Sequence, residues 1–233
     1  LGFGFIIGCL ALSRQWVFFI FLAFFVTYFK TKKYKKEYSK FVFSSFFVGF
    51  IFSGWFYFIN LFRYGAFTAF NSEMNKNLTL GRLYEFISFD NVINYIFTKP
   101  IRPYFENKFL PIFYSDTWGD YWGYFSFTSR FLDVGRNQLE IGSYLGIVNL
   151  LSVFTTSIIF YFYFKTMRRN KNNITLYLLN YSVIISFVGY FLFVFLFQHG
   201  SQGDVTKATY LVQMINIMVF SASISFENMK KTK

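Results

Sequence analysis

Four long stretches of apolar side chains most constrain what this chain can fold into. They cover residues 41–61, 141–164, 174–197 and 205–226, and the first three contain no Asp, Glu, Lys, Arg or His. Each has the roughly 20 residues that a helix rising about 1.5 Å per residue needs to cross a bilayer. Strands of membrane barrels alternate apolar and polar residues, whereas these stretches are apolar on every side. The sequence therefore predicts an all-α, polytopic bundle of transmembrane helices in a lipid bilayer.

The net charge of +12 is distributed unevenly along the chain. The excess of Lys and Arg falls in residues 30–40, in residues 165–173 and in the C-terminal tail, whereas acidic and basic residues balance in residues 62–140. Following the positive-inside rule, we predict that the basic segments are cytoplasmic and that residues 62–140 and 199–204 lie on the outer face. The basic clusters are short and adjoin membrane helices, so they suit anionic lipid head groups and not nucleic acid.

This topology divides the chain into three regions. Residues 1–61 would hold a short helix pair, whose first member we expect to be truncated at its start, the basic loop and the first full span. Residues 62–140 would form a long extracytoplasmic loop containing short interfacial helices, and residues 141–233 three spans and a short cytoplasmic tail. Apolar residues recur at helical spacing over residues 78–97, which predicts one such helix.

Two further local patterns give structural expectations. The prolines of the long loop should end the predicted helix and keep the chain extended. They are Pro100, Pro103 and Pro111. In the last span, Thr209, Gln213 and Asn216 share one helical face, and we expect that face to point into the bundle or a wet cavity.

The outer loop contains a short segment rich in aromatic and acidic residues. It includes Asp116, Trp118, Asp120 and Trp122, with a glycine after each tryptophan. Carboxylates accept hydrogen bonds from hydroxyl groups and aromatic faces stack on sugars, so the segment suits a sugar or another polar ligand. The same aromatic residues are also typical of a plain membrane interface.

A second candidate segment is the turn that enters the last span. It contains His199, Asp204, Lys207 and Tyr210. Asp204 could cap the start of the helix, and Lys207 could pair with it or bind an anionic substrate. Arg14, near the outer boundary, is a third candidate because arginine suits phosphate groups. His199 is the only histidine, so a His-cluster metal site is excluded, while a metal held by carboxylates stays open.

Taken together, four short segments resemble the polytopic glycosyltransferases of the GT-C architecture, which use lipid-linked sugars and include bacterial relatives of the protein mannosyltransferases. The segments cover residues 8–14, 55–65 (with Arg63), 116–123 and 203–210. The resemblance implies an enzyme of the bacterial inner membrane and cell envelope that transfers a sugar from a polyprenyl-phosphate donor to a glycan, lipid or protein acceptor on the outer face, without a cofactor.

In that family the catalytic acidic residue usually lies in a first outer loop, so this chain would be a C-terminal fragment without it. Asp116 and Asp120 are then the catalytic candidates. The resemblance assigns substrate contacts to eight residues of this sequence. These are Arg14, Arg63, Trp118, Trp122, His199, Asp204, Lys207 and Tyr210.

Two other functions remain open at this stage. A polysaccharide polymerase or ligase also uses many helices and a large outer loop, and it should bring several arginines into that loop's cavity. A non-enzymatic transporter should show repeats, broken helices or charges within the membrane. Apart from Lys207 near the start of the last one, the four long apolar stretches show no such feature.

Overall fold

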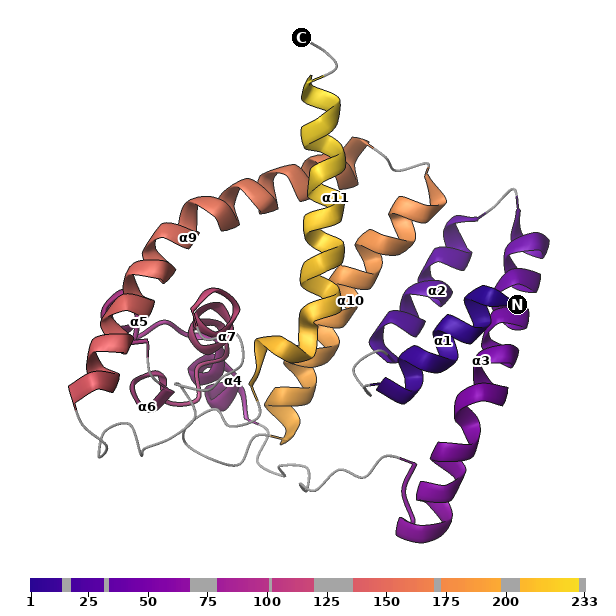
Figure 1. Cartoon of the computed structure of the whole chain (residues 1–233), viewed down its shortest axis with the longest axis horizontal. Helices are drawn as coiled ribbons and strands as arrows, with labels where there is room; N and C mark the ends of the chain where they lie inside the picture. The colour runs from indigo at the N-terminus through magenta and orange to yellow at the C-terminus, as the bar shows by residue number, and fades with distance from the viewer. Residues whose placement is uncertain are drawn as a thin grey trace.

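The fold is a bundle of helices, shown in Figure 1 as a computed structural model. It describes residues 1–13, 18–31, 34–67, 79–100, 102–119, 136–169, 173–197 and 206–230, and these ranges contain helices and no strand. Four helices are long and apolar enough to cross a membrane. They are α3 (Lys35–Tyr64), α9 (Arg136–Arg169), α10 (Ile174–Phe197) and α11 (Val212–Lys230), the last preceded by the 3₁₀ turn η2 (Ala208–Leu211). The predicted helical fold is confirmed, and four helices have the length and composition that spans require.

Two shorter apolar helices complete the N-terminal part of the bundle. Helix α1 (Gly2–Ser13) packs against α3, and α2 (Phe18–Lys30) packs against α10. The contact between α1 and α3 is close because Gly4 has no side chain: a Cβ there would lie 2.7 Å from the carbonyl oxygen of Ser45. Small residues allow such backbone approach, which stabilises helix pairs in lipid.

The basic segments meet at one end of the bundle. Figure 1 shows the start of α3, the end of α9 and the end of α11 at the same end. We call this the cationic end and define it by Lys30, Lys35 and residues 165–169. The contact between α2 and α10 is also cationic here, since the Lys30 ammonium lies 5.5 Å from the centre of the Tyr177 ring. The shared end is what the positive-inside pattern predicts for one side of a membrane.

Four short helices follow α3 in the chain, where the sequence predicts the long loop. They are α4 (Leu80–Ile87), α5 (Ile93–Thr98), α6 (Arg102–Phe105) and α7 (Phe109–Trp118). The single helix expected over residues 78–97 is broken between α4 and α5, where Asn91 has a left-handed φ of 63°. The expectation that the prolines keep the chain extended is also wrong for two of them. Pro103 and Pro111 lie in the first turns of α6 and α7, where a missing N–H costs no helical hydrogen bond.

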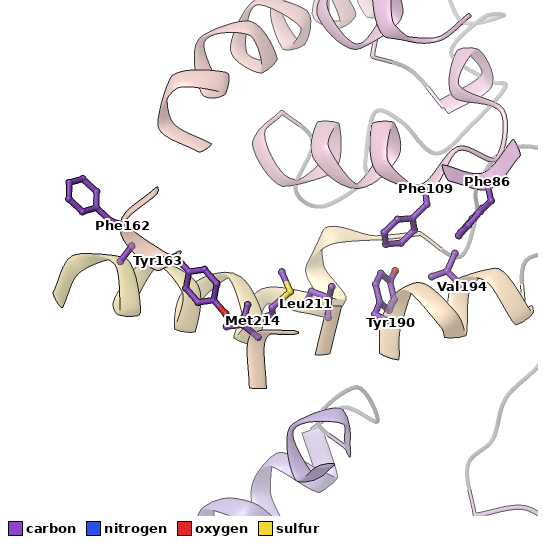
Figure 2. Close-up of a cluster of buried hydrophobic side chains, with 10 residues drawn as sticks. Phe86, Phe109, Phe162, Tyr163, Tyr190, Val194, Leu211 and Met214 are labelled. Atoms are coloured by element: carbon purple, nitrogen blue, oxygen red, sulfur yellow. The ribbon is translucent and has the colours of Figure 1, made fainter. Parts of the chain in front are cut away.

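These short helices lie between α9 and α10, beside the half of the bundle remote from the cationic end (Figure 1). Aromatic packing anchors them: the ring centre of Phe109 lies 6.0 Å from that of Tyr190 and 5.5 Å from that of Phe86. Figure 2 shows Phe86 and Phe109 facing Tyr190 and Val194 of α10. All four side chains are buried. The anchoring places α7 against the spanning helices.

The polar face expected on the last span is only partly turned toward the bundle, since Thr209 and Gln213 are half-buried. The buried face of η2 and α11 is formed by Leu211, Met214 and Ser221, which follow helical spacing, whereas Asn216 is exposed. Asn216 lies about 200° around the helix from Met214, so the two cannot share a face. The prediction is therefore wrong for Asn216.

Candidate functional site: an apolar groove beside a polar cluster

A large apolar groove lies between α9 and the pair α10 and α11. Its volume is about 750 Å³, within the range of roughly 300–1,000 Å³ that is common for ligand pockets. Five helices contribute to its lining. Representative residues are Ile96 of α5, Phe113 of α7, Phe160 of α9, Phe187 of α10 and Met214 of α11. No lysine, arginine or carboxylate lines it among the described residues, so the groove suits a hydrocarbon ligand.

The groove exists because α9 contacts its neighbours at two separated places. Figure 1 shows α9 arching away from α10 and α11 between a contact near the cationic end and a contact with α5 and α7. Apolar burial gives little driving force between helices in lipid, so hydrogen bonds and close packing must hold these contacts. Both contacts have such bonds.

Near the cationic end, hydroxyl groups join α9 to α11. The Thr166 hydroxyl donates to the carbonyl oxygen of Ser221 at 2.6 Å and lies 2.7 Å from the hydroxyl of Ser225. All three side chains are buried. A further bond links α9 to α10, because the Tyr163 hydroxyl donates to the carbonyl oxygen of Asn180 at 2.9 Å. These bonds close one end of the groove.

At the other end, a buried asparagine joins three helices. The side-chain nitrogen of Asn149 on α9 donates to the carbonyl oxygen of Ile96 at 2.9 Å and lies 3.0 Å from the hydroxyl of Ser115 on α7. The Tyr114 hydroxyl donates to the carbonyl oxygen of Asn149 at 2.7 Å. The side-chain oxygen of Asn149 is buried without a hydrogen-bond partner in the described part of the chain. This α5–α7–α9 polar cluster fixes the wall of the groove.

Helix α7 carries two of the predicted site residues into this region. Asp116 is 1% exposed and directly follows Ser115 of the polar cluster. Trp118 lines the apolar groove together with Thr117. The tryptophan predicted to stack on a sugar therefore borders a hydrocarbon-like surface, which the amphipathic indole ring also suits.

Tyr210 lies on η2, and Lys207 lies at the start of η2. Both are near the N-terminal end of α7. The backbone N–H of Lys207 donates to the Tyr190 hydroxyl at 2.7 Å, and the Lys207 ammonium lies 5.7 Å from the centre of the Tyr210 ring. Tyr190 in turn packs on Phe109, which lies about 10 Å along α7 from Asp116 at the usual helical rise. Helix α7 therefore contacts η2 at its Phe109 end, whereas most of the two segments that were predicted to meet lies outside the described residues.

The remaining predicted residues contribute less to this picture. Arg63 is exposed in the last turn of α3, whose C-terminal end lies on the far side of α10 from α7 (Figure 1), so the structure does not bring it to the groove. The other predictions fall outside the described residues. They are Arg14, Asp120, Trp122, His199 and Asp204. Within the described ranges, no three His, Cys, Asp or Glu residues gather as a metal site would require.

The structure also reveals polar residues that the sequence did not single out. The Arg82 guanidinium of α4 donates to the carbonyl oxygen of Phe195 at 3.0 Å and covers its ring at 5.1 Å. A cation is favourable at this C-terminal end of α10, where carbonyl groups lack helical partners. Lys108, just before α7, is 7% exposed, and its ammonium donates to the Ser88 hydroxyl at 2.8 Å. Sequence spacing gave no signal for either residue, because both partners are distant in the chain.

One tyrosine on the short helices has a shifted ionisation. The Tyr84 hydroxyl donates to a carboxylate oxygen of Asp90 at 3.0 Å. This hydrogen bond, and then the negative charge of Asp90, raise the pKa of Tyr84 above its ordinary value. Tyr84 is exposed and on α4, away from the groove lining. The pair therefore connects α4 to the turn before α5 and takes no part in the groove.

Comparison with known proteins adds no family to these observations. No protein-family model, no curated protein and no solved structure matches this chain. The resemblance to the GT-C glycosyltransferases therefore stays a prediction from the sequence.

Proposed function

We propose that this chain is part of a membrane glycosyltransferase that uses a polyprenyl-phosphate-linked sugar, and that the groove holds the hydrocarbon chain of this donor. The observation that carries the proposal is the apolar groove of about 750 Å³ within the spanning helices, beside helix α7, which lines it with apolar side chains and also carries Ser115 and Asp116. A lipid-linked donor needs both an apolar site for its chain and a polar site for its reacting head group. The groove and α7 lie in that arrangement.

The transfer itself needs a base that deprotonates the acceptor hydroxyl and cations that stabilise the departing phosphate. In this proposal Asp116, buried on α7, is the acidic candidate, and Lys207 supplies positive charge at the other end of that helix. The acceptor would be a glycan, a lipid or a protein. The cationic end would face the cytoplasm of a bacterial inner membrane, so that α7 lies toward the outer half.

The polymerase or ligase alternative gains no specific support from the groove. It calls for arginines in the cavity, whereas Arg82 is bonded to the end of α10 and Arg63 lies elsewhere. The transporter alternative likewise has no broken spanning helix to support it in the described ranges, since α3, α9 and α10 are continuous.

A pair of matched variants on α9 tests the groove. Val153 lines it and is 39% exposed, whereas Val148 is 41% exposed and does not line it. We expect Val153→Trp to weaken binding of a polyprenyl-phosphate sugar, measured by native mass spectrometry from detergent, by at least about tenfold, because the indole fills space that the chain needs. Val148→Trp should bind like the wild type. Equal binding by both variants would contradict the proposal that the groove holds the donor's hydrocarbon chain.

Labelling of introduced cysteines tests the orientation. After Cys9, which is exposed, is replaced by serine, cysteines at positions 36 and 168 should react with an impermeant maleimide only from the cytoplasmic side. A cysteine at position 84 should react only from the outer side. Labelling of positions 36 and 168 from different sides would contradict the proposed topology.

A further inference from the structure

Lys108 is a cationic residue that is buried. Its side chain is 7% exposed, and lysine is rarely buried without a charged partner. Lys108 occupies the N-cap position of α7, and its ammonium reaches the hydroxyl of Ser88, the C-cap residue of α4. In the ranges that the structure describes, no carboxylate lies within salt-bridge distance of its ammonium.

The ammonium also has unused hydrogen-bonding capacity. It carries three N–H donors, and its one acceptor among the described residues is the Ser88 hydroxyl at 2.8 Å. The Ser88 hydroxyl accepts this bond and donates to the carbonyl oxygen of Glu85 at 3.3 Å. No side chain caps the first turn of α7, and because Pro111 has no N–H, that turn leaves the N–H groups of Phe109 and Leu110 without a helical partner. Two sets of unused donors, those of the ammonium and those of the first turn of α7, therefore occur at the start of this helix.

The place of this cluster identifies the kind of anion. Phe89, next to Ser88, and Leu110, two residues after Lys108, both line the apolar groove. An anion bound here would sit at the edge of a hydrocarbon site. The nearby carboxylate of Asp90 is already bonded to the Tyr84 hydroxyl. Phosphate supplies several strong acceptor oxygens and a charge that would neutralise the lysine.

We infer that Lys108, Ser88 and the first turn of α7 form a binding site for the phosphate of a lipid whose chain lies in the groove. The inference rests on the proposed function and deepens it, because it names the residues that would hold the donor's phosphate. It assigns to Lys108 the role that the sequence gave to Arg14 and Lys207. The same chemistry would also accept free phosphate, so the experiment must separate the two sources.

The test compares three probes on the purified full chain in detergent: a polyprenyl phosphate, the uncharged polyprenol of equal length, and inorganic phosphate. Wild-type protein should bind the lipid phosphate at least about tenfold more tightly than the polyprenol, since a charge-assisted bond to a buried group contributes that much. Lys108→Met should bring the ratio to within about twofold. Lys108→Arg should keep most of it, and Lys99→Met, which changes an exposed lysine after α5, should leave it unchanged.

The possible results separate this inference from the proposed function. Equal binding of the two lipids by the wild type, or an unchanged ratio in Lys108→Met, would overturn the phosphate site while polyprenol binding still supported the groove. Binding of neither lipid would defeat the proposed function itself. Inorganic phosphate binding as tightly as the lipid, and depending on Lys108, would overturn the lipid assignment. If Lys108→Met is not monodisperse on size exclusion, Lys108→Gln, which keeps a donor without the charge, decides the question by the same ratio.

Discussion

Gly146 is the residue at which one added methyl group should most destabilise the wall of the groove. It lies on α9 against the end of α5, and a Cβ there would be 2.5 Å from the carbonyl oxygen of Phe97 and 3.0 Å from the backbone nitrogen of Thr98. Both contacts are to backbone, so no side chain can rotate away. Gly146→Ala therefore requires α5 to move from α9 by about 1 Å to restore ordinary contact.

The expected cost follows from three terms. Overpacking of this kind costs about 1–3 kcal/mol. The same movement would stretch the bond from Asn149 to Ile96, now 2.9 Å, beyond hydrogen-bond distance, which costs a further ~1–3 kcal/mol because Asn149 is buried. Alanine offsets about 1 kcal/mol through its better helix propensity. The net destabilisation should be about 1–5 kcal/mol.

Denaturant unfolding in detergent measures this cost, with Gly81→Ala on α4 as the control. A Cβ at Gly81 meets nothing within 4 Å, so that change should be neutral or stabilising by up to about 1 kcal/mol. The double variant Gly146→Ala/Asn149→Ala adds a second check. Because Gly146→Ala already breaks the hydrogen bond of Asn149, the costs of the two single variants should sum to more than the cost of the double variant. Strict additivity, or a Gly146→Ala as stable as the wild type, would refute the close contact between α5 and α9.

Two further predictions concern single side chains. Tyr190→Phe removes the acceptor of the Lys207 N–H, and because Tyr190 is buried, the loss should cost about 1–3 kcal/mol of stability. Amide hydrogen exchange should become faster only in η2 and its neighbours, and unchanged exchange there would contradict the bond. Asp90→Asn removes the charge that raises the pKa of Tyr84, so the pKa should fall toward its ordinary value of about 10. Because the pKa of Tyr84 is raised in the folded state, folding favours the protonated phenol. The hydrogen bond of Tyr84 therefore contributes stability below about pH 10, and this contribution is lost as the pH rises further. A difference titration against Tyr84→Phe measures the shift, and an unchanged pKa would show that Asp90 is not its cause.

The spans could be predicted from the sequence because their length and composition are local properties. Residues 174–197 were bounded by polar residues on both sides, and α10 has these limits. The position of α7 could not be predicted, because it depends on contacts between distant residues, such as Tyr114 with Asn149 and Phe109 with Tyr190. Asn216 shows a different limit: its polar neighbours defined a common face, but the side that is buried was set by packing of Met214 and Ser221 against other helices.

The candidate site shows the same division. The sequence pointed to Asp116 and Trp118 because acidic and aromatic residues occur together there. Both lie on α7, where Trp118 lines the groove and Asp116 does not. It gave no reason to choose Lys108 among the many lysines, because burial is a property of the folded chain. The sequence did not predict the groove, because most of its lining residues belong to apolar stretches that indicate only membrane-spanning helices.

Photo-crosslinking tests the central claim, that a lipid chain occupies the groove, most directly. A polyprenyl phosphate carrying a diazirine in its chain should label the groove-lining residues Phe160, Phe187 and Met214 in preference to Phe43 and Phe47, which are exposed on α3. Excess unlabelled polyprenyl phosphate should abolish the groove labelling. Equal labelling of both sets, insensitive to competitor, would show that the lipid merely surrounds the protein and would contradict the claim.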